Sequence, residues 1–117
     1  MKKINLHFIP TQVLFFYGLD DYTKWVKANL NDYAQFLPNS SGLTVSTNGE
    51  KGHIVLIYIS DEKIDKNKKI GLIAHEINHA SDFIYKEHGF DCTELKSYLM
   101  QYVLTEILNF LEKKEQL

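Results

Sequence analysis

Cysteine is nearly missing from this sequence, which contains a single one, Cys92, among 117 residues. A lone cysteine cannot form a disulfide within its own chain, and this usage is typical of a reducing compartment. An excess of charge of one sign is missing as well, because the formal net charge is −2. A chain without a broad cationic surface has little to offer a phosphate backbone, so we expect no nucleic-acid partner.

Long hydrophobic runs are also absent, and no stretch approaches the roughly 20 apolar residues of a membrane helix. The N-terminal segment "MKKINLHFIPTQVLFFYGL" begins like a signal peptide. Polar residues and Pro10 interrupt its apolar part, however, and no A-x-A-like cleavage site follows. We therefore expect a cytoplasmic protein without a membrane partner.

The composition is typical of a globular domain, with 44% hydrophobic and 24% charged residues. A chain of this length is expected to form one domain, residues 1–117, around one modest core. One or both of the segments "KINLHFI" and "QVLFFYG" are expected to be strands, followed by a helix from Asp20 or Asp21 to about Phe36. A hairpin of "LTVST" and "HIVLIYIS" is expected next, with its turn at Asn48-Gly49. Two helices are expected to follow, one from about Asp65 to between Tyr85 and His88, ended by Gly89, and one from Asp91 or Cys92 to about Lys114. This order predicts the α+β class.

The stretch "LIAHEINHASDF", residues 72–83, carries an H-E-x-x-H motif made by His75, Glu76 and His79. Residues four apart on a helix project to the same side, so the two imidazoles can reach one Zn²⁺. Glu76 lies about 100° further round the helix, where its carboxylate is close enough to bond a water on the metal. The motif therefore predicts a zinc hydrolase site with Glu76 as the general base.

A coincidental motif on a core helix is the alternative interpretation. The neighbouring residues are mostly apolar and embed the motif in a helix with a core face: Leu72, Ile73, Ala74, Ile77, Ala80 and Ile84. Two histidines and a glutamate would be costly to bury in such a helix with nothing to bind. This cost favours the metal site.

A catalytic zinc site usually has a third protein ligand. The metzincin pattern fails, because Asp82 stands where glycine is needed and Tyr85 where the third histidine is needed. A carboxylate from the following helix remains, with Glu94 as the first candidate; the others are Asp91, Asp82, His88 and Glu106. Glu94 also has an ordinary explanation, since "DCTE" approximates a capping box with Asp91 as the N-cap.

The segment "IAHEINHASDFIYKEHGFDCTELKSYLMQYV" resembles the small zincin-like metallopeptidases encoded in phage and prophage genomes. In that family H-E-x-x-H-A is followed by a short apolar helix end, a glycine, and a helix that begins E-x-x-x-Y-L. Here this element reads "ELKSYL", which puts Glu94 at the ligand position and Tyr98 four residues later. The resemblance implies a minimal zincin fold, in which a small mixed sheet packs on the motif helix and a C-terminal ligand helix.

The leading hypothesis is a zinc-dependent peptidase acting on a peptide or protein substrate. The apolar strand "HIVLIYIS" is expected either to be buried on both faces or to have an open edge, and in the peptidase hypothesis it provides the edge for an extended substrate. Tyr98 would stabilise an oxyanion or else lie in the core. Asp82 could hydrogen-bond a ligand imidazole from behind, whereas His7, His53 and His88 are expected to be surface or structural residues. The alternative is a zincin-fold interaction module that binds metal with little or no turnover.

Overall fold

A computed structural model describes all residues from 1 to 117. The chain folds into four strands, three α-helices and one 3₁₀ helix. In chain order they are β1 (Lys2–Asn5), β2 (Thr11–Tyr17), α1 (Leu19–Asn29), the 3₁₀ helix (Tyr33–Phe36), β3 (Gly42–Gly49), β4 (Gly52–Ile59), α2 (Lys66–His88) and α3 (Thr93–Lys113). The predicted α+β class is confirmed.

The four strands form one mixed sheet in the order β1-β2-β4-β3. β2 and β4 run parallel in the centre, with Val13 opposite Val55, and each outer strand pairs antiparallel with its neighbour. Because β2 and β4 are covered on both faces, their residues are apolar on both sides rather than alternating. "HIVLIYIS" is therefore a central strand, so the alternative that it is buried on both faces is confirmed and the alternative that it offers an open edge is wrong.

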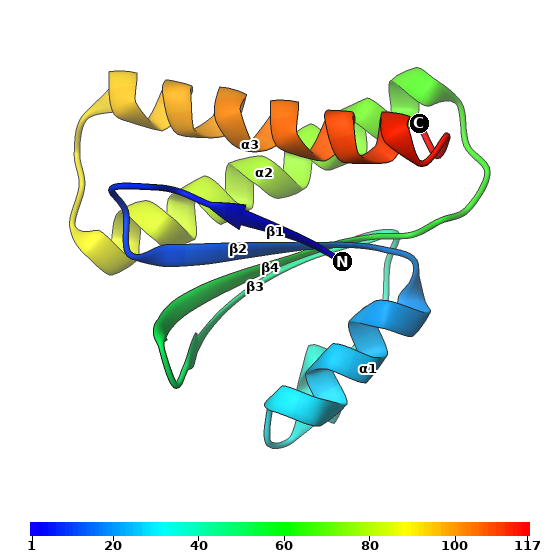
Figure 1. Ribbon diagram of the computed structural model, residues 1–117, viewed down its shortest axis with the longest axis horizontal. Helices are drawn as coiled ribbons and strands as arrows, with labels where there is room; N and C mark the ends of the chain where they lie inside the picture. Colours follow the sequence, from blue (N-terminus) through cyan, green and yellow to red (C-terminus); the bar gives the residue numbers. More distant parts are fainter.

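Helices cover both faces of the sheet (Figure 1), with α2 and α3 side by side on one face and α1 on the other. The larger core lies under α2 and α3, where Phe15 of β2 meets Phe110 of α3 edge to face. The smaller core lies under α1 and contains Phe16, Tyr22 and Val26. None of the helices combines the length and apolar character needed to cross a membrane.

The ends of α2 follow the predicted signals. The Asp65 side chain accepts a hydrogen bond from the backbone N–H of Asn67 at 3.2 Å and caps the first turn. Gly89 ends the helix in the left-handed region, at φ 68°, which glycine adopts without steric cost. The helix therefore runs its full predicted length and stops at His88.

Three local predictions need correction. The helix expected to reach Phe36 ends at Asn29, because Leu30 adopts an extended conformation (φ −122°, ψ 136°), and it begins at Leu19, just before the expected start at Asp20 or Asp21. The hairpin turn falls on Glu50 and Lys51, since Gly49 still pairs with Gly52. The N-cap of α3 is Cys92, without a side-chain hydrogen bond, so Asp91 does not form the expected capping box.

The two edges of the sheet differ in composition. β1 has four residues and carries Lys2 and Lys3, and lysines discourage another strand from pairing with an edge. β3 has eight residues, "GLTVSTNG", and none of them is charged or proline. The open edge of β3 therefore lacks the usual features that prevent strand addition.

Candidate metal centre

His75 and His79 lie one helical turn apart on the exposed face of α2. Their Nε2 atoms are 3.1 Å apart, and the two rings meet edge to face. Two nitrogens bound to one tetrahedral Zn²⁺ at about 2.0–2.1 Å would be separated by about 3.3 Å. The pair therefore fits two positions of a tetrahedral zinc site with little adjustment.

Glu76 contacts the edge strand β3. Its side chain is only 5% exposed. The Thr44 hydroxyl lies 2.7 Å from Oε1 of Glu76 and 3.0 Å from the backbone oxygen of the same residue. A partly buried carboxylate needs such a donor, because burial without hydrogen bonds disfavours a charge.

One surface pocket of about 390 Å³ brings the three motif residues together between α2 and β3. Its wall also includes the first residues of β3 and the exposed ring of Phe83, one turn beyond His79. The pocket is lined by Ser40, Gly42, Leu43, Thr44, His75, Glu76, His79 and Phe83. The motif thus faces a cleft along the edge of the sheet.

The apolar neighbours of the motif divide between two environments. Ile73, Ile77, Ala80 and Ile84 are buried against the sheet and α3, as expected for the core face. Ala74 is exposed, so the prediction that every apolar neighbour embeds the motif in the core is too broad. The core face holds α2 in place and leaves the histidines accessible.

The predicted third ligand, Glu94, does not join the histidines in the structure. It lies exposed in the first turn of α3, and α2 continues to His88 instead of ending early and bringing that turn closer. No group of three or more His, Cys, Asp or Glu side chains is close enough to hold a metal ion. The pocket therefore contains two ligand nitrogens and the general-base candidate, and the role of Glu94 stays a prediction.

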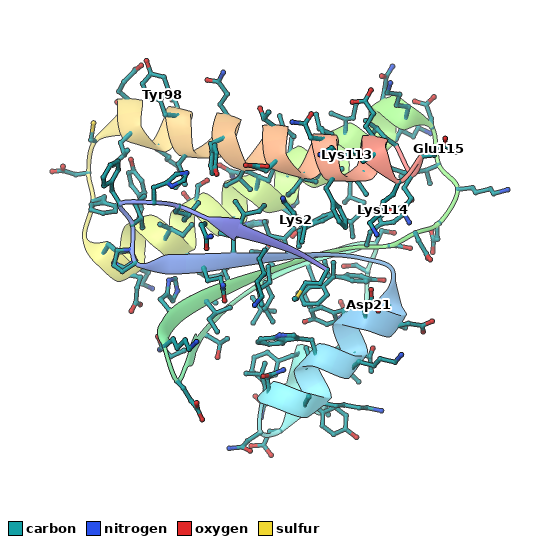
Figure 2. All side chains as sticks on the ribbon, viewed as in Figure 1. Lys2, Asp21, Tyr98, Lys113, Lys114 and Glu115 are labelled. Atoms are coloured by element: carbon teal, nitrogen blue, oxygen red, sulfur yellow. The ribbon has the colours of Figure 1, made fainter.

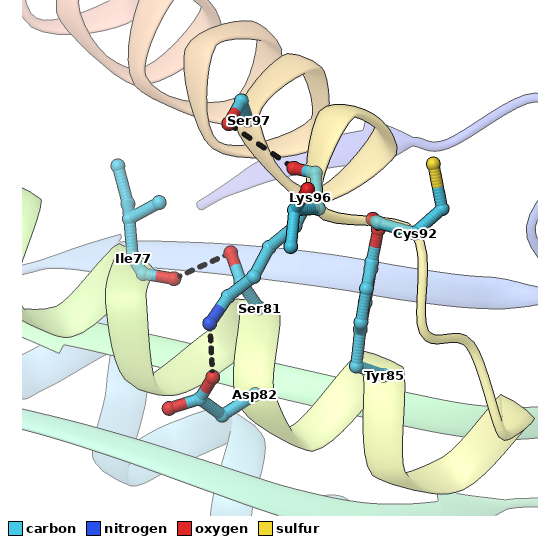
Figure 3. A network of polar contacts seen from close by, with 8 residues as sticks. Ile77, Ser81, Asp82, Tyr85, Cys92, Lys96 and Ser97 are labelled. Carbon is cyan, nitrogen blue, oxygen red and sulfur yellow. Dashed lines mark hydrogen bonds and ion pairs between the residues drawn. The ribbon is translucent and has the colours of Figure 1, made fainter.

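The remaining ligand candidates make other contacts. Asp82 pairs with Lys96 of α3, as Figure 3 shows, and does not support a histidine ring as predicted. His88 bonds the Thr11 hydroxyl, and Glu106 lies 3.9 Å from the Lys2 ammonium. These contacts connect α2 and α3 to each other and to the sheet.

Tyr98 lies on the outer side of α3, where Figure 2 shows its side chain pointing away from the sheet. It is 61% exposed and does not line the pocket. The structure thus does not bring Tyr98 to the histidines, and it does not lie in the core either. Its predicted oxyanion role stays a prediction.

A second polar cluster lies near the far end of α2. His53 of β4 is 5% exposed and bonds the Ser46 hydroxyl through Nε2 at 2.7 Å and the Thr11 hydroxyl through Nδ1 at 2.8 Å. His88 reaches the same Thr11 oxygen at 2.6 Å. This chain joins four elements and makes His53 and His88 structural residues, as predicted.

Comparisons with known proteins gave no match to a family model, to a curated protein or to a solved structure. The family that the sequence resembles therefore stays a prediction. The function has to be inferred from the pocket and its residues.

Thr44 and Gly42 are pocket residues that the sequence did not indicate. They lie more than thirty positions before the motif, and neither belongs to a recognisable pattern. Only the placement of β3 beside α2 brings them to Glu76. The edge role of β3 was missed for the same reason, since strand order depends on long-range pairing.

Proposed function

We propose that this protein is a zinc-dependent peptidase whose reaction takes place in the pocket between α2 and β3. The observation that carries the proposal is the Nε2–Nε2 separation of 3.1 Å between His75 and His79, next to a carboxylate on the neighbouring residue. A helical histidine pair with this spacing suits zinc, and the adjacent glutamate suits a general base.

Zn²⁺ held by His75 and His79 would polarise a peptide carbonyl and acidify a water molecule. Glu76 would take the proton of the attacking water and later return it to the leaving amine. Its neighbour Thr44 keeps the carboxylate hydrogen-bonded while it is charged. For the third ligand we propose Glu94, supplied by a shift of the first turn of α3 toward His79.

The open edge of β3 supports a peptide as the substrate. An extended chain can add to such an edge through main-chain hydrogen bonds. β3 is uncharged over its whole length, whereas the opposite edge strand carries Lys2 and Lys3. Thr44 of β3 contacts Glu76, so a peptide paired with this strand would pass directly beside the general base.

The test compares the wild type with Glu76→Gln, with Glu87→Gln as the matched control on an exposed position of the same helix. All three proteins should hold about one zinc per chain, because the histidines are untouched. On a mixed peptide pool analysed by mass spectrometry, Glu76→Gln should lose about 10²–10⁴-fold in rate, and Glu87→Gln should not.

Three outcomes separate the hypotheses. Cleavage by the wild type and Glu87→Gln alone supports the peptidase. Equal cleavage by all three proteins would rule out Glu76 as the base. Zinc binding by all three without cleavage would favour the metal-binding interaction module.

A further inference from the structure

The two carboxylate oxygens of Glu76 have different surroundings. Oε1 lies 2.7 Å from the Thr44 hydroxyl, which has one hydrogen to donate. The charged oxygen is both the closer and the stronger acceptor, so this hydrogen belongs to Oε1 rather than to the backbone oxygen of Glu76 at 3.0 Å. Oε1 is thereby occupied by the edge strand.

Oε2 lies against Gly42, two residues earlier on β3. A Cβ atom at Gly42 would come within 2.8 Å of Oε2, closer than real Cβ contacts. Gly42 pairs with Ile59 as ordinary strand and does not have positive φ, so backbone conformation is not what requires glycine here. The missing side chain is what gives Oε2 its space.

Oε2 accepts no hydrogen bond from a protein group, and it is not completely enclosed. Only one side-chain atom, Oε1 of Gln116, is both fully buried and without a hydrogen-bond partner. Oε2 of Glu76 also lacks a partner, so it must retain some exposed surface. Glu76 lines the pocket that it shares with His75 and His79. The exposed surface of Oε2 is therefore assigned to this pocket.

We propose that Gly42 and Thr44 are positioning residues that make Oε2 the proton-accepting oxygen of Glu76. Thr44 holds Oε1, and Gly42 leaves room for a water at Oε2. The water gives its proton to Oε2, and its oxygen bonds the carbonyl carbon of the peptide as the carbonyl π pair moves to oxygen. Collapse then breaks the C–N bond, and the proton passes from Oε2 to the amine. This inference rests on the proposed function.

The first experiment needs neither zinc nor activity. The ¹³C chemical shift of the Glu76 carboxylate is measured at fixed pH in the wild type, Thr44→Val, Thr44→Ser and Gly42→Ala. Thr47→Val is the matched control, because it removes a hydroxyl from the same strand on the opposite face. We expect Thr44→Val and Gly42→Ala to move this resonance and Thr44→Ser and Thr47→Val to leave it unchanged.

An unchanged Glu76 resonance in folded Thr44→Val would overturn the inference. Folding is checked from the amide spectrum of each variant. If Thr44→Val does not fold, the Glu76 shifts of Gly42→Ala and Thr44→Ser are compared instead, since neither substitution removes the hydroxyl. An unchanged Glu76 resonance in Gly42→Ala would then overturn the inference.

The second experiment uses zinc-loaded protein and the peptide pool. Thr44→Val and Gly42→Ala should lower kcat by about tenfold or more with unchanged KM and zinc content, while Thr44→Ser keeps the wild-type rate. Equal kcat in all variants would overturn the positioning role. If the wild type does not cleave, the proposed peptidase fails, and the carboxylate shifts still decide whether Gly42 and Thr44 position Glu76.

Discussion

His75 and Glu76 are neighbours in sequence but end in opposite environments. Successive positions on a helix differ by about 100°, so one side chain faces solvent while the next turns toward β3. His75 and His79 are exposed, and Glu76 is almost fully buried against Thr44. Helical geometry sets the angle between the ligands and the base, and the placement of β3 beside α2 gives Glu76 its buried surroundings.

His53 shows how burial acts on a single residue. Burial lowers the pKa of its imidazole below the ordinary value of 6.5, and His88 adds to this effect while Glu87 opposes it. A neutral ring still satisfies both hydroxyl partners, because one nitrogen can donate and the other accept. The folded protein thus prefers neutral His53.

A pH dependence follows at this residue. Between the lowered pKa of His53 and 6.5, the unfolded chain binds more protons than the folded one. The stabilisation from neutral His53 is therefore fully present above pH 6.5 and is lost as the pH falls through that window. Urea unfolding of metal-free protein from pH 7.5 to 5 should show this loss, and His53→Gln should show less of it. The same pH profile in His53→Gln and the wild type would contradict the prediction, with exposed His7→Gln as the control.

At the scale of elements, two glycines of α2 differ in backbone conformation: Gly71 is helical, and Gly89, the C-cap, is left-handed. A side chain at either Gly71 or Gly89 would meet no atom within 4 Å, so only backbone conformation differs. Gly71→Ala in the helix interior should raise the free energy of unfolding by about 0.5–1 kcal/mol. Gly89→Ala, at φ 68°, should lower it by about 1–2 kcal/mol. Chemical denaturation measures both, and changes of the same sign would contradict the assignment of Gly89 as the stop of α2.

The first turn of α3 is held to α2 by exposed contacts. They are the Lys96–Asp82 ion pair and the hydrogen bond from the Tyr85 hydroxyl to the Cys92 carbonyl (Figure 3). An exposed ion pair contributes about 0–1 kcal/mol, so the Lys96–Asp82 pair alone holds this turn only weakly. Because Glu94 lies on this turn, it can act as the third ligand only if the turn as a whole moves.

Glu94→Ala should therefore lower zinc affinity more than Asp91→Ala does. Asp91 is the control because it precedes the N-cap of α3 and lies in the same exposed connection. A lost carboxylate ligand weakens the metal directly, whereas Asp91→Ala leaves all proposed ligands in place. Competition with a chelator of known affinity measures the difference. Equal affinities in the two variants would exclude Glu94 as the third ligand and make Asp82 or Glu106 the next candidate.

At the scale of the whole molecule, the pocket depends on the layers around it. α2 packs on the sheet through its core face, and β3 is held in position by β4, so the two walls of the pocket belong to different parts of the chain. A metal that binds only this folded arrangement stabilises the entire fold by mass action.

Zinc should accordingly raise the melting temperature. At a free concentration about 100 times its dissociation constant, zinc adds about 2.7 kcal/mol to the free energy of unfolding. Thermal unfolding followed by circular dichroism should show this increase for the wild type and none for His79→Ala, which retains a single ligand of the pair. A similar increase in both proteins would mean that zinc binds elsewhere.

Much of this architecture could be predicted from local patterns. The start of α2 near Asp65, the stop at Gly89 and the hairpin arms depend on nearby residues, and these predictions are confirmed. The prediction of a helix beyond Asn29 is wrong because apolar spacing continues to Phe36, while the backbone leaves the helical conformation at Leu30. The hydrophobicity of β4 indicated burial but did not show which strand would be the edge.

The motif and its helix follow from local spacing, because helical geometry relates His75, Glu76 and His79 through positions only one to four apart. The position of β3 at the edge of the sheet, and the contacts of Gly42 and Thr44 with Glu76, follow only from the packing of distant segments. The same packing leaves Glu94 apart from the histidines. The physical reason is that strand order, register and helix placement depend on contacts between distant segments, which no local pattern encodes.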